Sequence, residues 1–199
     1  PGMNVNRKYL GESVSTGAME SFYDQASAEP TSADVSVVAT CDANGNISAE
    51  VTATFAATVT TEHRLAAVLV ENGVTGGSGY EQANYYSNQS QNLALTSPNS
   101  GGMPNFDWQA AANPVPSSSM VYDHVGVALY GGYNGQANSI TTPANAGSSQ
   151  SYTFTGSVGQ SQAWNLHVVG MLINSSTGEI MNANEAGLQL LGMPEYSII

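Results

Sequence analysis

The sequence predicts a mainly β protein, an antiparallel β-sandwich of immunoglobulin-like or jelly-roll-like type, preceded by a short N-terminal strand and helix. Two observations carry this prediction. From about residue 34 onward, apolar residues recur with a period of two in several short segments. Clusters of Gly, Asn, Ser and Pro separate these segments, as turns separate the strands of a sandwich. At 199 residues with one cysteine, the chain can bury a core without disulfides.

The helix is expected at residues 12–28, "ESVSTGAMESFYDQASA", with Pro30 just beyond its end. Apolar side chains recur there at helical spacing, at Val14, Ala18, Met19, Phe22, Tyr23 and Ala26.

Residues 34–59 predict the first hairpin. A two-residue Asn-Gly turn would place valines of the first strand opposite polar residues of the second. A three-residue loop, Ala43-Asn44-Gly45, instead aligns apolar residues, with Gly45 in the left-handed conformation. This register pairs Cys41 with Ile47, Ala39 with Ala49, Val37 with Val51 and Val35 with Ala53. Cys41 is therefore predicted to be a buried core thiol.

Further strands are expected at residues 63–72, 120–130, 149–157 and 163–174. The first and last are apolar on both faces, as in inner strands that are covered on two sides. Residues 175–178, Ser-Ser-Thr-Gly, predict a turn, after which 179–183 return antiparallel and carry Ile180 and Met181 into the core. Residues 74–118, rich in Gly, Ser, Asn and Pro, predict a long surface excursion.

The charge balance limits the partners. With 3 Lys and Arg against 15 Asp and Glu, the formal net charge is -12, which disfavours binding to nucleic acids and anionic membranes. No apolar run approaches the roughly 20 residues that a membrane-spanning helix needs. Only 9% of residues are charged, so Ser, Thr, Asn, Gln and Gly must build the surface. This composition is more usual outside cells than inside, so it favours an extracellular location.

Four segments, in their order along the chain, carry a family resemblance: "PGMNVNR", with Pro1, Asn6 and Arg7; "RLAAVLVENGV"; "YDHVGVAL"; and "VVGMLINSSTGEIMNA". Together they resemble the 28-kDa outer-membrane protein family of Bacteroidetes surface proteins, in which a thioredoxin-like domain precedes a β-sandwich. The resemblance implies that residues 1–31 are the end of a thioredoxin-like domain and that 32–199 form the sandwich. It also implies that Pro1 stands at the cis-proline position of the thioredoxin-like fold.

The half that would hold a Cys-x-x-Cys pair is absent from this chain, so the sequence as given predicts no redox activity. The segment "YDHVGVAL" departs from the family tendency toward an Arg after His-Val, since Gly126, Val127 and Ala128 follow here.

Residues Asp42, Asn44 and Asn46 have the alternate spacing of a calcium loop. The glycine stands one place too early and no acidic residue closes the loop, so the hairpin turn is the preferred interpretation and no metal is predicted.

The three histidines, His63, His124 and His167, could meet at a zinc site with Glu62 or Asp123, but they lack the paired spacing of a metal motif. Asp123 and His124 suggest a catalytic triad, yet adjacent residues on a strand point to opposite faces. We therefore predict no catalytic residue and no cofactor.

The excursion gathers five aromatic residues among Asn and Gln, a mixture that suits protein or sugar surfaces: Tyr80, Tyr85, Tyr86, Phe106 and Trp108. They are the predicted partner-binding residues. The alternative is that these rings fasten the long loop to the sandwich.

These observations predict a non-catalytic, secreted or cell-surface protein that acts in binding or surface assembly, with possible self-association. Two alternatives remain open. One is the C-terminal part of a thiol-disulfide oxidoreductase-like surface protein, which a Cys-x-x-Cys pair encoded upstream of Pro1 would favour. The other is a carbohydrate-binding module that uses the aromatic excursion.

Overall fold

The computed structural model describes residues 3–11, 16–85, 87, 106–158 and 164–192. The chain divides into two compact units, one formed by Pro1–Leu69 with Ala128–Ile199, and one by Val70–Val127. Each unit is described by itself. No helix among the described residues is long and apolar enough to cross a membrane.

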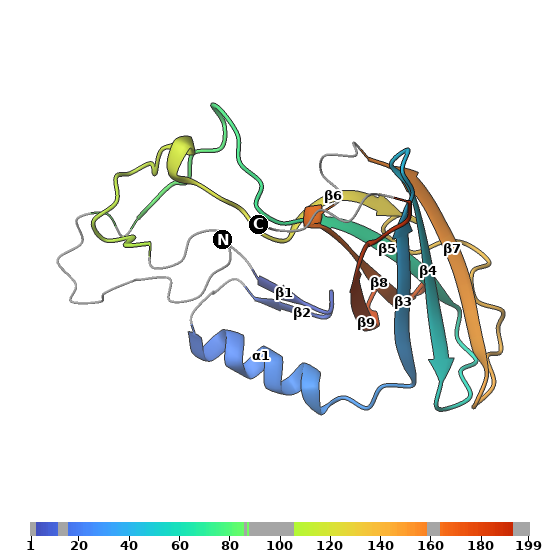
Figure 1. The fold of residues 1–199 in the computed structure, drawn as a ribbon. Helices are drawn as coiled ribbons and strands as arrows, with labels where there is room; N and C mark the ends of the chain where they lie inside the picture. Colours follow the sequence, from blue (N-terminus) through green and yellow to red (C-terminus); the bar gives the residue numbers. More distant parts are fainter. Residues whose placement is uncertain (1–2, 12–15, 86, 88–105, 159–163, 193–199) are drawn as a thin grey trace. The chain divides into compact units, whose positions relative to one another are not determined.

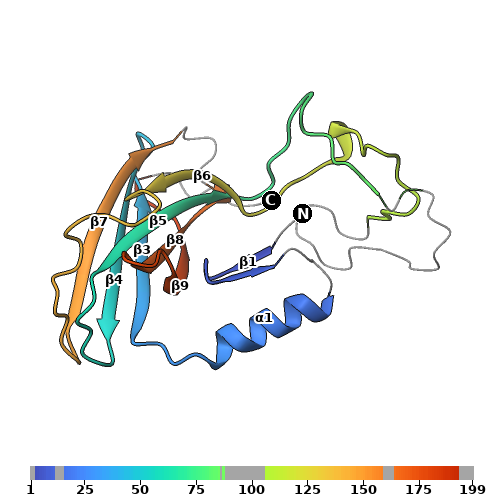
Figure 2. The ribbon, with the colours of Figure 1, turned by 180° about the vertical axis from the view of Figure 1, so that it is seen from behind.

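Two four-stranded sheets build the fold (Figures 1 and 2). The first has the order β10-β3-β4-β7, with β3 at Ala33–Cys41, β4 at Asn46–Phe55, β7 at Ser149–Ser157 and β10 at Gln189–Leu190. The second has the order β6-β5-β8-β9, with β6 at Val125–Tyr130, β5 at His63–Glu71, β8 at Leu166–Asn174 and β9 at Ile180–Gly187. The predicted β-sandwich is confirmed.

The hairpin of β3 and β4 has the register that apolar matching predicts. Cys41 pairs with Ile47, and Val37 pairs with Val51. Gly45 closes the loop with a φ of 81°, and the backbone N–H of Asp42 donates to the carbonyl of Asn46 at 3.0 Å. The Cys41 thiol is free and its side chain is fully buried, as predicted.

Alternation places one face of β3 and β4 in the core and the other in water. Val51 is fully buried and Phe55 is 1% exposed, while Val37 is half-buried and packs against the same cluster. The second sheet contributes the facing core residues Leu65, Ala67, Leu69, Val168 and Leu172.

Strands β5 and β8 are also buried on their second face, as their two-sided apolar pattern predicts. Ala66, Met171 and Ile173 form a separate buried cluster there, with Ile180 of β9 packed against it. Together with β9, β8 forms the predicted hairpin, and Gly178 in its turn has a φ of 79°.

Two expected strands begin later than predicted. The strand expected at 163–174 begins at Leu166 as β8, and the strand expected at 120–130 begins at Val125 as β6. His124 has a φ of 57°, a conformation that ends regular strand geometry, and the preceding Tyr122 forms a single bridge with Val74.

The N-terminal elements are β1 at Met3–Val5, β2 at Tyr9–Gly11 and the helix α1 at Thr16–Ala28. The helix confirms the predicted one, whose first residues, 12–15, lie outside the described part of the chain. The turn between β1 and β2 contacts the sandwich. The N–H of Ile180 donates to the carbonyl of Asn6 at 2.9 Å, and the Arg7 guanidinium lies 3.9 Å from the ring centre of Tyr133.

Candidate partner-binding site

Four of the five predicted aromatic residues belong to the described part of the Val70–Val127 unit. Tyr85 is 80% exposed and Tyr80 is 40% exposed, whereas Phe106 and Trp108 are half-buried. The fifth residue, Tyr86, lies outside the described residues. Large apolar rings in contact with water are available for binding here, so the prediction of a partner surface stays open.

The aromatic rings form two separate pairs. Phe106 and Trp108 meet edge to face, with ring centres 4.8 Å apart. Tyr80 pairs with Tyr122 at 6.2 Å, and the Tyr122 hydroxyl donates to the Tyr80 carbonyl at 2.8 Å. Gly76 makes room for the Tyr80 ring, since a Cβ at position 76 would lie 2.3 Å from its Cδ2. Tyr122 was not predicted as a member of this group.

A buried asparagine, which the sequence analysis did not predict, holds residues 108–113 of this unit in place. Asn84 is 2% exposed, and its side-chain amide donates to the carbonyls of Trp108 at 2.6 Å, Ala112 at 3.3 Å and Ala111 at 3.4 Å. Its own N–H donates to the Oδ1 of Asn113 at 3.0 Å. Asn84 therefore fixes the backbone that carries Trp108.

We expect Asn84→Leu to loosen this unit, because leucine matches the size of asparagine and leaves those carbonyls without their donor. Each unsatisfied buried polar group costs about 1–3 kcal/mol. Hydrogen exchange should accelerate at residues 106–113 and the fluorescence of Trp108 should shift. The exposed neighbour variant Ala83→Leu should change neither. Unaltered exchange in Asn84→Leu would show that Asn84 does not hold this segment.

The predicted calcium-loop residues build the β3–β4 turn. The Asp42 carboxylate accepts the N–H of Asn44 at 2.8 Å, the N–H of Asn46 at 2.9 Å and the side-chain amide of Asn46 at 2.8 Å. These bonds hold the pKa of Asp42 below its ordinary value, the Asn46 side chain having the largest effect. The oxygens that a cation would use already accept hydrogen bonds, which supports the turn interpretation.

The lowered pKa of Asp42 gives an expected pH dependence. Because the folded-state pKa lies below the unfolded one, the charged turn stabilises the protein above the unfolded pKa, and this contribution is lost as pH falls through the folded pKa. Asp42→Asn should therefore be less stable than the parent at neutral pH, with the difference shrinking in acid. Urea denaturation at several pH values measures this difference, and a constant difference would contradict the assignment.

A polar contact joins the N-terminal hairpin to the end of α1. Glu29 accepts a hydrogen bond from the ammonium of Lys8 at 2.6 Å and one from the hydroxyl of Tyr9. The bond from Lys8 has the largest effect in lowering the pKa of Glu29. Beside this contact lies a cavity of about 340 Å³ whose lining includes Asn6, Lys8, Glu29 and Glu179. Both basic and acidic side chains line this cavity, and the lining identifies no particular ligand.

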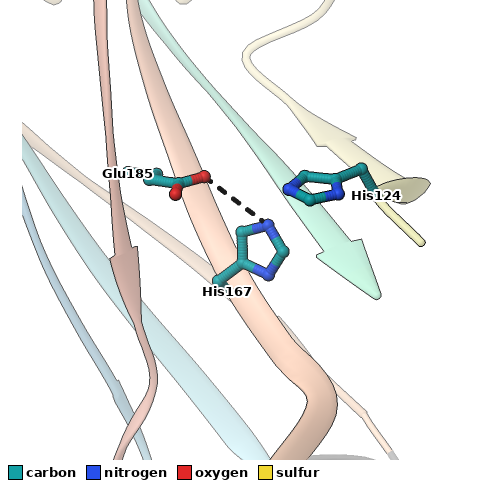
Figure 3. A group of neighbouring side chains, drawn as sticks. All are labelled: His124, His167 and Glu185. Atoms are coloured by element: carbon teal, nitrogen blue, oxygen red, sulfur yellow. Dashed lines mark ion pairs between the residues drawn. The ribbon is translucent and has the colours of Figure 1, made fainter. Parts of the chain in front are cut away.

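The predicted zinc candidates lie on separate elements. His63 is 3% exposed, and its Nδ1 lies 2.9 Å from the Thr61 carbonyl, so that nitrogen carries the proton. His167 of β8 lies 3.7 Å from a carboxylate oxygen of Glu185 on the adjacent strand β9 (Figure 3). Glu185 was not among the residues predicted for a site. His124, also drawn in Figure 3, belongs to the Val70–Val127 unit.

The single thiol has an environment unsuited to redox chemistry. Cys41 lies in the core, and burial raises the pKa of its thiol above the ordinary value, with Asp42 adding to the effect. Thiol-disulfide exchange needs an accessible thiolate. The geometry therefore assigns Cys41 to packing.

Comparisons with known proteins show the fold. No family model and no curated protein sequence matches this chain. Among solved structures, HBP35 of Porphyromonas gingivalis is similar over 95% of this chain and 52% of its own, with 11% identity and a TM-score of 0.57. This chain thus spans about half the length of HBP35. A domain of the outer membrane lipoprotein Omp28 from the same organism matches 82% of this chain and 93% of its own, at 11% identity and a TM-score of 0.41. The resemblance predicted from the sequence is confirmed at the level of the fold, which this chain shares with HBP35.

Proposed function

We propose that this chain is a non-catalytic β-sandwich protein of the outer membrane or cell surface that acts in binding or surface assembly. One observation carries the proposal. Hydroxyl side chains in register make up much of the solvent face of β3, β4 and β7, where Thr40 pairs with Ser48, Ser36 with Thr52, Ser48 with Thr155, Thr52 with Ser151, and Thr54 with Ser149. The same face also carries the exposed residues Asp34, Val38 and Glu50. Hydroxyls both donate and accept hydrogen bonds, so the uncharged hydroxyl pairs of this face can bond to another polar surface.

Several findings support this proposal. The fold is that of HBP35, and Omp28 is named as an outer membrane lipoprotein. Cys41 packs in the core, and Asp42 stabilises the β3–β4 turn, so both residues have structural roles. A thiol-disulfide oxidoreductase activity would need thiols other than Cys41.

Light scattering over a concentration series tests the assembly part of the proposal, and pull-down from surface extracts with the immobilised chain tests the binding part. We expect concentration-dependent association or capture of a defined partner. Monomers at every concentration together with no captured partner would overturn the proposal.

The exposed rings of Tyr80 and Tyr85 favour a second candidate, a carbohydrate-binding role. A glycan array is the test, with Tyr85→Ala as the matched variant. Binding that Tyr85→Ala abolishes would favour this candidate, and an array without hits would remove it.

A further inference from the structure

We propose that the free edge of β7 is a self-pairing surface, on which a second copy of this chain adds its own β7 antiparallel to the first. This inference rests on the proposed role in assembly and names its interface. β7 is the last strand of its sheet, next to β4 (Figures 1 and 2).

The backbone of β7 leaves one row of groups unpaired. The N–H of Phe55 donates to the Ser148 carbonyl, and the N–H of Val158 donates to the Gly45 carbonyl. These bonds continue the β4–β7 ladder, so even-numbered residues of β7 bond to β4 and odd-numbered ones point N–H and C=O away from it. Within the described residues, no backbone group bonds to the outward groups of Ser151, Thr153, Thr155 or Ser157.

The opposite edge of the same sheet is covered. Along β3, the side-chain amides of Asn182 and Asn184 on β9 donate to the carbonyls of Ala33 at 2.9 Å and Val35 at 3.0 Å. At the other end of β3, β10 pairs with Thr40 and Cys41. The contrast singles out β7 as the available edge.

The devices that usually protect an exposed edge are missing from β7. Natural edges carry lysines, other charges, proline or bulges. From residue 124 through residue 178 the sequence contains no Asp, Glu, Lys or Arg, although the chain as a whole has a charge of -12. β7 itself contains no proline, and its register with β4 is continuous over nine residues.

The sequence of β7 matches its own reversed copy. A two-fold axis at Thr153 would place Thr153 opposite Thr153 of the second copy and Ser151 opposite Thr155. Hydroxyl pairs of this kind stabilise antiparallel strands. On the inner face, Tyr152 would lie opposite Phe154 of the second copy. The Gln150 side chain bonds to the backbone of Thr141 at 2.7 and 3.1 Å, so the proposed pairing uses the stretch that follows it. A self-complementary patch of this kind closes as a symmetric dimer.

Sedimentation velocity on the intact chain tests the proposal with three variants. Thr153→Lys places like charges opposite each other at the axis, and Thr153→Pro removes an outward N–H without removing a β4–β7 bond. Ser36→Lys is the matched control, because Ser36 is exposed on the same face of the sheet but on β3. Circular dichroism checks that each variant folds.

We expect the parent and Ser36→Lys to form dimers that increase with protein concentration and with salt, since salt screens the repulsion between acidic copies. Both Thr153 variants should remain monomeric over the same range. Association that persists in both folded Thr153 variants would overturn the β7 interface while leaving assembly intact. A parent that is monomeric throughout would overturn this inference, and capture of a different partner would then still support the proposed function.

Discussion

Replacing Gly170 with valine is expected to destabilise the protein by about 3 kcal/mol or more. Gly170 is buried on β8, where a Cβ would lie 2.6 Å from Cγ2 of Val37 and 2.8 Å from Cγ1 of Val51. Both neighbours are β-branched and Val51 is fully buried, so they cannot rotate away. Overpacking of a core costs about 1–3 kcal/mol, and valine adds two methyl groups beyond alanine.

Urea denaturation followed by circular dichroism measures this effect. Gly187→Ala on the adjacent strand β9 is the matched control, because a Cβ there meets nothing within 4 Å. Its stability should stay within about 0.5 kcal/mol of the parent. If Gly170→Val were as stable as the parent, the two sheets could not approach each other this closely at Gly170.

The second large effect is expected for Phe55→Ala, a loss of about 3–5 kcal/mol, as for other buried phenylalanines. Phe55 is 1% exposed and is among the largest fully buried side chains described. It stands at the end of β4, and its backbone bonds to Gly147 and Ser148 should survive the change. The loss should therefore reflect the cavity and the lost apolar contacts.

Thermal and urea unfolding give the measurement, and Tyr23→Ala is the control. Tyr23 lies on α1 with 68% of its surface exposed, so its removal should change stability by less than about 0.5 kcal/mol. Equal effects of the two substitutions would contradict the assignment of Phe55 to the core.

Local patterns were sufficient to predict much of the fold. In the β3–β4 hairpin, apolar matching and a glycine at the left-handed position exclude the alternative register, so sequence neighbours alone fix the pairing of Cys41 with Ile47. The same holds for the β8–β9 hairpin. These elements depend on period and turn chemistry over short distances.

Long-range features escaped prediction for a physical reason. Asn84 bonds to carbonyls 24 to 28 residues away, and Asn182 bonds to Ala33 across 149 residues, yet neither asparagine differs in sequence from one in a loop. The pairing of Tyr80 with Tyr122 could not be predicted from the sequence either, because a separation of 42 residues matches neither a helical nor a strand period. The partner-binding role of the aromatic residues and the division at residue 31 remain predictions.

The asparagine contacts from β9 to β3 have a consequence for any assembly through the first sheet. Amide groups of the same molecule occupy the β3 edge of this sheet, so a second molecule can add only at the β7 edge. In a two-fold dimer both β7 edges are paired with each other, and no edge of this sheet is left for a third molecule. Growth through this sheet should stop at two molecules. A lattice or fibre would need a chemically different second contact, and disrupting Asn182 and Asn184 together could turn a terminating pair into a propagating one.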